Sequence, residues 1–241
     1  MSVNRNNKPS ITSTIFLVLI SSSGFLIISA FNASVSTKVE GDGFHRIVKY
    51  YVDTGGFKND SCHISVFVSL PISLYVNVDE LADLRRLHES NVCSEGEVDV
   101  ELFAEKARYQ NFTICTRLRS TKTVLSVPVH QRYRFATTKG HAYVVKLFKP
   151  KLLLGCKDRI TNLRVSKYKI CKPCLAYAKK WREVPYQWKG DGNFTWIVPV
   201  GNANRKFEVT LITLFITIGG AVYVLWAINN SYKKPRERKI K

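Results

Sequence analysis

Apolar and polar residues alternate along much of the middle of the chain. Residues 62–70 read CHISVFVSL, in which every even-numbered position is apolar and most odd-numbered positions are polar. A period of two is typical of a strand with one buried face, so a half-buried strand is predicted here. Runs rich in β-branched and aromatic residues predict further strands at 47–52, 98–103, 142–148, 151–154 and 194–200.

The stretch 127–135, VPVHQRYRF, shows the same alternation with an unusual set of polar residues. One face of this predicted strand holds Leu125, Val127, Val129, Tyr133 and Phe135, with Gln131 breaking the apolar row, and the other holds Ser126, His130, Arg132 and Arg134. Pro128 indicates an edge strand or a bulge, because proline cannot donate a ladder hydrogen bond. The alternation explains the apolar half of the pattern but not the choice of polar side chains.

A single short helix is predicted among these strands. Leu81, Leu84 and Leu87 recur every three residues after Asn77 or Asp79, either of which can cap a helix. Several short strands without alternating long helices favour a mainly β fold, and we expect an antiparallel β-sandwich-like domain.

Two long apolar runs lie outside the alternating region. The run 209–228 has no charged residue, is long enough to span a membrane, and precedes a basic tail, 229–241. By the positive-inside rule this tail is cytosolic. Residues 1–31 have the layout of a signal peptide, and an uncleaved signal anchor is the alternative. Both interpretations place the β-rich segment, 32–208, in the lumen, and we predict a single-pass type I membrane protein.

The cysteines and the glycosylation motifs fit this lumenal segment. An even number of cysteines in an oxidising compartment predicts disulfide bonds, although the pairing does not follow from the sequence. The six residues are Cys62, Cys93, Cys115, Cys156, Cys171 and Cys174. Sequons for N-glycosylation begin at Asn32, Asn59, Asn111 and Asn193.

The net charge of +19 by itself indicates little about the function. A lumenal protein does not meet nucleic acid, so the basic residues between 151 and 189 form either a surface for anionic lipid groups or a solvated face. The final residues, RKIK, resemble a dibasic signal for retrieval to the endoplasmic reticulum, but ordinary positive-inside anchoring also accounts for their charge.

Each candidate catalytic group has a structural alternative. Cys171 and Cys174 form a CxxC pair that could exchange disulfides, but no thioredoxin-like βαβ pattern surrounds it, which favours structural disulfides. His130 could act as a general base, yet the sequence assigns it no partner. Asp99, Glu101 and Glu105 could pair for sugar chemistry, although the first two are better interpreted as neighbours on one strand face. Zinc is not predicted, because the histidines lack ligand spacing. The sequence therefore assigns no catalytic residue, metal ligand or cofactor.

Several of these stretches together resemble one family, PIG-X. They occur in the same order and with the same spacing through nearly the whole predicted lumenal segment. The matching stretches are FHR at 44–46, Cys62, LPISLYVNVDEL at 70–81, VDVE at 98–101, VPVHQRY at 127–133, residues 150–156 and VPVG at 198–201.

The resemblance implies a noncatalytic protein of the endoplasmic reticulum membrane, an accessory subunit of GPI mannosyltransferase I. Such a subunit stabilises the multispanning catalytic partner, PIG-M, which transfers the first mannose in GPI-anchor biosynthesis. The residues that we expect to support the fold or contact the partner are Glu80, Glu101, His130, Arg132 and Tyr133.

The chain departs from the family pattern at several positions. The family usually has Gly in place of Ser73, Asp-Pro in place of Asn77-Val78, and often His in place of Arg134. The CKPC pair and the lysine-rich stretch around it are also outside that pattern. Two other functions therefore stay open from the sequence: a membrane-tethered thiol oxidoreductase and a cargo receptor of the early secretory pathway.

Overall fold

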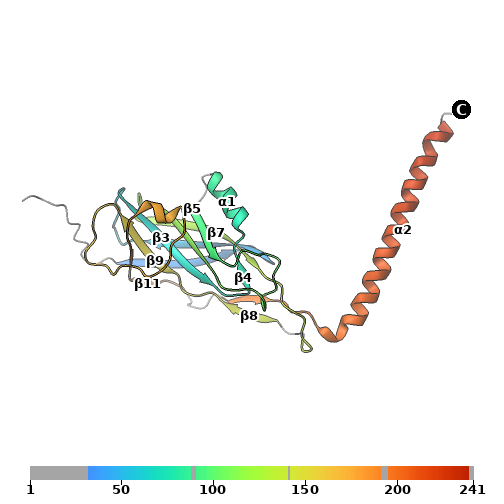
Figure 1. The fold of residues 1–241 in the computed structure, drawn as a ribbon, viewed down its shortest axis with the longest axis horizontal. Coiled ribbons are helices and arrows are strands. Elements are labelled where there is room, and N and C mark those ends of the chain that lie inside the picture. Colours follow the sequence, from blue (N-terminus) through green and yellow to red (C-terminus); the bar gives the residue numbers. More distant parts are fainter. Residues whose placement is uncertain (1–31, 88–90, 141, 191–194, 239–241) are drawn as a thin grey trace, which may run out of the picture.

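The computed structural model describes residues 32–87, 91–140, 142–190 and 195–238. The predicted signal segment 1–31, the glycosylation candidate Asn193 and the last three residues, which contain most of the predicted retrieval signal, lie outside the described residues. The described chain forms a β domain from which one long helix projects (Figure 1).

Two five-stranded sheets make up the β domain. The first sheet has the order β11 (Tyr186–Trp188), β1 (Ala33–Glu40), β2 (His45–Asp53), β7 (Lys122–Gln131) and β4 (Leu74–Tyr75). The second has the order β10 (Trp181–Glu183), β9 (Lys151–Cys156), β3 (Cys62–Leu70), β6 (Gln110–Arg117) and β5 (Asn91–Gly96). A small third sheet pairs β8 (Tyr143–Lys146) with β12 (Thr195–Val198).

The strand pairs are antiparallel with one exception, β1 with β11, which is parallel. The chain passes from β10 in the second sheet to β11 in the first within a few residues. The predicted strand at 62–70 coincides with β3, and those at 47–52, 142–148, 151–154 and 194–200 overlap β2, β8, β9 and β12.

The main core lies between the two five-stranded sheets. Val48 and Val127 of the first sheet and Ile64 of the second are fully buried in one apolar cluster. Tyr50 and Phe112 face each other across it, with 6.4 Å between ring centroids. Two sheets that bury their inner faces against each other form a sandwich, so the predicted fold class is confirmed.

A second apolar cluster lies on the outer face of the second sheet, where a segment of the chain covers that face. Ile170, Cys174 and Ala178 pack against Phe67 of β3 and Leu153 of β9. The covering segment contains a short 3₁₀ helix, η1 (Cys174–Tyr177). The expectation that β3 is half-buried is therefore wrong, because this segment buries its second face as well.

Three disulfides link the six cysteines. Two of them, Cys93–Cys171 and Cys115–Cys174, attach the covering segment to β5 and β6. The third, Cys62–Cys156, joins residues that are register partners on β3 and β9. The predicted use of the cysteines in structural disulfides is confirmed.

Two sequence-based predictions about strands are wrong. Residues 98–103 have irregular backbone with bends, where Glu97 Oε1 accepts a hydrogen bond from the Asp99 backbone N–H (3.2 Å) and Asp99 Oδ1 accepts one from the Glu101 N–H (2.9 Å). Such local side-chain bonds compete with a strand ladder. The strand of the VPVHQRYRF stretch ends at Gln131, so Tyr133 and Phe135 are exposed, whereas they were expected on the buried face.

The short helix is α1 (Val78–Arg86), capped by Asn77 as predicted. Leu81 is buried in the main core, while Leu87 lies exposed just after the helix end. A second 3₁₀ turn, η2 (Ala203–Arg205), leads into the long helix α2 (Lys206–Arg238). The part of α2 up to residue 232 is long and apolar enough to cross a membrane, and its most apolar window has no buried residues.

Candidate functional site

Two histidines lie side by side on the outer face of the first sheet. His45 of β2 and His130 of β7 are register partners on neighbouring antiparallel strands. Their rings stack nearly parallel, with centroids 4.6 Å apart and 3° between the ring planes. Tyr75 of β4 stacks on the other side of His130 at 5.1 Å. Three strands thus contribute to one row of rings.

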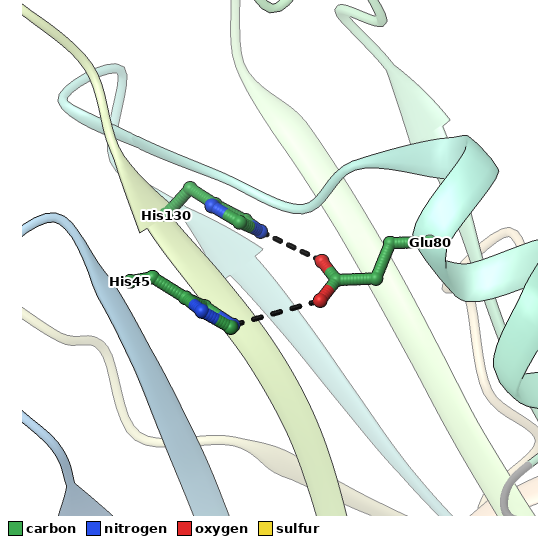
Figure 2. Close-up of side chains that lie close together, drawn as sticks. All are labelled: His45, Glu80 and His130. Carbon is green, nitrogen blue, oxygen red and sulfur yellow. Dashed lines mark hydrogen bonds and ion pairs between the residues drawn. The ribbon is translucent and has the colours of Figure 1, made fainter.

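A carboxylate from α1 joins the two imidazoles. Glu80 Oε2 lies 2.7 Å from His130 Nε2, and Glu80 Oε1 lies 3.5 Å from His45 Nε2 (Figure 2). We refer to His45, Glu80 and His130 as the histidine–carboxylate cluster. His130 therefore has the partner that the sequence could not assign. His45 was missed as a site residue, although it belongs to the FHR stretch at 44–46.

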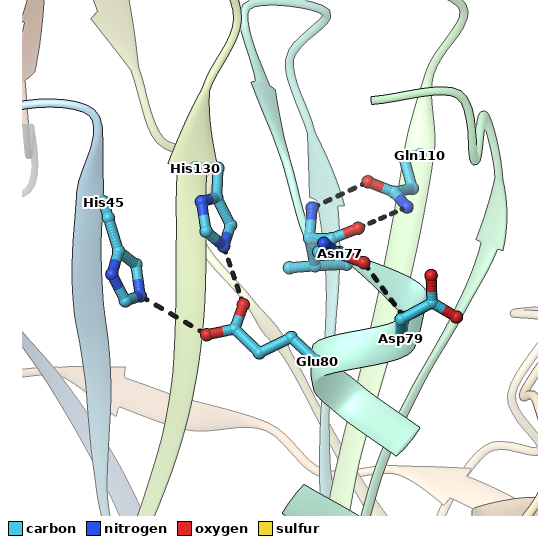
Figure 3. Close-up of polar contacts among 7 residues, drawn as sticks. His45, Asn77, Asp79, Glu80, Gln110 and His130 are labelled. Atoms are coloured by element: carbon cyan, nitrogen blue, oxygen red, sulfur yellow. Dashed lines mark hydrogen bonds and ion pairs between the residues drawn. The ribbon is translucent and has the colours of Figure 1, made fainter. Parts of the chain in front are cut away.

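The position of Glu80 is fixed by hydrogen bonds at the start of α1. The Asn77 side chain accepts a bond from the Asp79 N–H (2.9 Å), which caps the helix. Just before the cap, Gln110 of β6 donates to the Val76 carbonyl (3.0 Å) and accepts from the Val76 N–H (2.9 Å) (Figure 3). These contacts join α1 to the second sheet, while Glu80 reaches to the first.

Arg132 is buried beside this cluster. It is only 2% exposed, its guanidinium lies 4.6 Å from the Tyr75 ring centroid, and its Nη1 donates to the carbonyls of Asp99 (2.6 Å) and Leu102 (3.2 Å). Burial lowers the pKa of Arg132, and the nearby carboxylates of Glu97 and Asp99 oppose that change. Burial also raises the pKa of Tyr75, against the effect of the Arg132 charge. The prediction of Arg132 on an outward polar face is wrong, because the chain leaves the strand after Gln131.

Glu101 and Tyr133 lie apart from the histidine–carboxylate cluster. Glu101 is exposed in the turn after β5, and its backbone N–H donates to Asp99. Tyr133 is 67% exposed and packs on Phe44, with ring centroids 4.9 Å apart. Of the five residues expected to support the fold or contact a partner, Glu80 and His130 are thus in direct contact.

The other candidate catalytic groups have structural partners. Cys171 and Cys174 do not bond to each other, since each forms a disulfide with a different strand. Glu105 forms an ion pair with Arg134 (3.1 Å), and Asp99 and Glu101 share a turn and not a strand face, contrary to expectation. A dithiol couple or a carboxylate pair for acid–base chemistry is therefore not assembled by these residues.

The glycosylation candidates differ in their surroundings. Asn32 is exposed just before β1. Asn59 Oδ1 accepts hydrogen bonds from the N–H and the hydroxyl of Ser61 (2.8 and 2.9 Å). Asn111 lies within β6, and Thr113 of the same sequon is buried. Glycosylation at any of them stays a prediction.

Five basic residues of the stretch 151–189 line a hollow at the edge of the second sheet. The hollow has a volume of about 420 Å³ and is lined by Lys157, Arg159, Lys179, Lys180 and Arg182, together with Asp158. A separate hollow of about 290 Å³ adjoins the histidine–carboxylate cluster and is lined in part by Ile47, Leu84 and Pro128. Ser126 also lines this hollow, but it is four residues from His130 along β7, or about 13 Å, too far to serve as its nucleophile.

Comparison with known proteins assigns the family. The model of the PIG-X / PBN1 family matches residues 41–229, which include most of the β domain and much of α2. The chain belongs to this family. A human relative, named "GPI alpha-1,4-mannosyltransferase I, stabilizing subunit", is 29% identical over 200 residues, which cover 78% of this chain and 76% of the relative. The resemblance seen in the sequence is thereby confirmed.

Two departures from the usual PIG-X pattern are in contact. Arg134 Nη1 donates to Ser73 Oγ (2.9 Å), so the side chains that stand in place of His and Gly hydrogen-bond to each other. The pair Asn77-Val78 fills the positions of an Asp-Pro pair in a helix start, because Asn and Asp both cap and Pro is favoured at the first helical position.

Proposed function

We propose that this chain is the noncatalytic stabilising subunit of GPI mannosyltransferase I, required for the first mannose transfer in GPI-anchor biosynthesis. The observation that carries the proposal is the family match over residues 41–229, from the end of β1 into α2, together with the name of the human relative. The catalytic partner in this proposal is the multispanning mannosyltransferase PIG-M.

The structure supports a role in binding rather than in chemistry. The groups that could have formed a redox pair or a carboxylate pair are in disulfides, turns and ion pairs. Two surfaces are available for a partner. One is α2, whose apolar side chains are exposed, and the other is the outer face of the first sheet, where Ile47, Tyr51 and Val124 are exposed.

In the proposed arrangement α2 lies in the membrane against helices of the catalytic subunit. Helices in lipid associate through close packing and interhelical hydrogen bonds, which requires no large polar surface. The β domain then contacts lumenal loops of the same partner. This gives the stabilising subunit two attachment points on one multispanning enzyme.

We further propose the endoplasmic reticulum as location, with residues 32–208 lumenal, 209–228 in the membrane and 229–241 cytosolic. The three disulfides support an oxidising environment for the β domain. Residues 1–31 serve as the signal peptide or signal anchor in this topology. Protease protection of the β domain in intact microsomes, with digestion of a tag at residue 241, is the expected result.

The experiment that tests the function is deletion of this chain in cells. We expect three changes together: loss of GPI-anchored proteins from the surface, a lower abundance of the catalytic mannosyltransferase, and accumulation of the glycolipid that lacks its first mannose. Re-expression of the full chain restores all three. Normal enzyme abundance with normal mannosylation in the deleted cells would refute the proposal.

A matched variant separates this function from the thiol oxidoreductase alternative. Replacement of Lys172 by Ala changes the residue next to Cys171 without removing a disulfide. Such a change alters the reactivity of a catalytic CxxC pair, but it leaves a stabilising subunit active. We expect K172A to restore GPI-anchored surface proteins to the wild-type level.

A further inference from the structure

The three side chains of the histidine–carboxylate cluster present donor atoms of the kinds that bind transition metals. One ligand atom from each of His45, Glu80 and His130 lies within 4.8 Å of the other two. We propose that this cluster binds a divalent transition-metal ion, with Zn²⁺ as the best fit. The proposal rests on these residues alone and does not depend on the proposed function.

The donor set selects the class of metal. Two imidazole nitrogens and one carboxylate oxygen form a ligand set that is common for zinc, whereas calcium and magnesium prefer sites made of oxygen atoms. At metal–ligand bonds of about 2.0 to 2.1 Å, tetrahedral ligand atoms are about 3.4 Å apart. The observed separations from Glu80 are 2.7 Å to His130 Nε2 and 3.5 Å to His45 Nε2. Binding therefore requires shifts of less than about 1 Å in these two separations.

The orientation of the rings requires one adjustment. Both Nε2 atoms point toward Glu80 (Figure 2), but the rings are parallel to within 3°, so their lone pairs run side by side and do not converge. One ring must turn about its Cβ–Cγ bond for both nitrogens to reach the same ion. The side chain of His45 is 54% exposed and has room for that rotation, while His130 is held between His45 and Tyr75.

The backbone holds the three ligands from separate elements. His45 and His130 are fixed by the β2–β7 ladder, and Glu80 is fixed by the capped first turn of α1. A bound ion would thus connect α1 to the first sheet, in place of the Glu80–His130 hydrogen bond and the longer Glu80–His45 ion pair. Three protein ligands leave a fourth position of a tetrahedral ion for water or for a side chain of a partner.

The test measures metal binding by the full chain in detergent, without a polyhistidine tag. After equilibrium dialysis against Zn²⁺, metal analysis should give one tightly bound ion per wild-type chain. Co²⁺ in place of Zn²⁺ should give the visible absorption of a tetrahedral site. The variants are His45→Ala, His130→Ala and Glu80→Gln. The matched control is Glu105→Gln, because Glu105 and Glu80 are both 31% exposed and both pair with a basic side chain.

The proposal predicts at least a tenfold loss of Zn²⁺ affinity in each cluster variant, since even the loss of a residue behind the ligands costs about 10- to 100-fold. The control should bind like the wild type. Zn²⁺ should also raise the melting temperature of the wild type but not of His45→Ala. His45→Ala is the variant that keeps the fold, because its side chain is the most exposed of the three. No stoichiometric zinc, or unchanged binding in His45→Ala and Glu80→Gln, would overturn the proposal.

Discussion

The two sheets of the β domain differ in what covers their outer faces. The outer face of the second sheet is sealed by the segment around η1, which packs on Phe67 and Leu153 and is attached by two disulfides. The outer face of the first sheet is open: Ile47, Tyr51 and Val124 are exposed there, and α1 reaches it through the polar contact of Glu80. We refer to these as the sealed face and the open face.

This difference indicates that the two faces have different roles, one in stability and one in partner binding. The covering segment has little regular secondary structure, so its position depends on apolar burial and on its two disulfides. A disulfide stabilises the fold by reducing the conformational entropy of the unfolded chain. The open face carries exposed apolar residues next to a polar cluster, a composition that suits contact with another protein. Changes on the sealed face should therefore affect the stability of the β domain most, and changes on the open face should affect binding to the catalytic subunit most.

The largest expected effect comes from breaking the sealed face. Replacing Cys115 and Cys174 by Ser removes the disulfide between β6 of the second sheet and η1. We expect the free energy of unfolding to fall by about 2 to 5 kcal/mol. Denaturant unfolding of the full chain measures this, and hydrogen exchange locates it. Protection should fall in β9 and β10 before it falls in β2 and β7, and a uniform loss would show that the two faces are not independent.

A smaller effect is expected at the base of α1. Gln110→Leu removes both hydrogen bonds to Val76 and leaves a buried N–H and a buried carbonyl without that partner. The expected cost is about 1 to 3 kcal/mol of unfolding free energy for such a group. Gln187→Leu, at an exposed position of β11, is the control and should unfold like the wild type. Equal stability of the two variants would contradict the role of Gln110 in attaching α1.

The sealed face should also be the more sensitive to acid. His63 of β3 is 7% exposed and stacks on Tyr177 of the covering segment, with ring centroids 4.6 Å apart. Burial, with smaller contributions from the charges of Arg117 and Lys157, lowers the pKa of His63 below its ordinary value of 6.5. The unfolded chain then takes up the proton first as the pH falls.

Acid removes the stability that neutral His63 contributes to the folded state. The contribution of a neutral His63 is fully present above pH 6.5 and is lost as the pH falls from there through the lower pKa of the folded state. We expect the unfolding free energy to drop as the pH falls below 6.5, and His63→Phe to reduce the drop. The other histidines are the same in both proteins, so the difference isolates His63. An identical pH dependence would exclude it as the source.

The smallest effect on stability is expected on the open face. Val124→Lys changes an exposed side chain of β7, so the unfolding free energy should stay within about 0.5 kcal/mol of the wild type. If this face binds the catalytic subunit, the variant should nevertheless recover less of that subunit in a pull-down from membranes. Lys122→Ala, on the same strand and also exposed, is a control for a change in surface charge. Full recovery with Val124→Lys would place the contact elsewhere.

The sequence predicts some of these features for clear physical reasons. The period of two at 62–70 corresponds to β3, because a strand of a two-sheet sandwich places every second side chain in the core between the sheets. The leucine spacing and Asn77 predict α1, because its start depends on local hydrogen bonds. The strands β1, β4, β5, β6, β10 and β11 were not predicted. Residues 98–103 were predicted as a strand, but side-chain hydrogen bonds to nearby backbone N–H groups are found there instead.

The candidate site depended on contacts that the sequence does not display. His130 and Glu80 are fifty residues apart in the chain, and His45 joins them through the register of β2 and β7. The covering segment was not predicted either, because its position follows from the pairing of cysteines with β5 and β6, which composition alone leaves open. Long-range register and disulfide pairing are the information that was missing.

The half-life of the catalytic mannosyltransferase tests the central claim most directly. It should be measured by pulse–chase in cells that lack this chain, in the same cells after re-expression of the wild type, and in cells that express Val124→Lys. A stabilising subunit predicts a short half-life without the chain, full restoration by the wild type and partial restoration by the variant. An equal half-life with and without the chain would contradict the account.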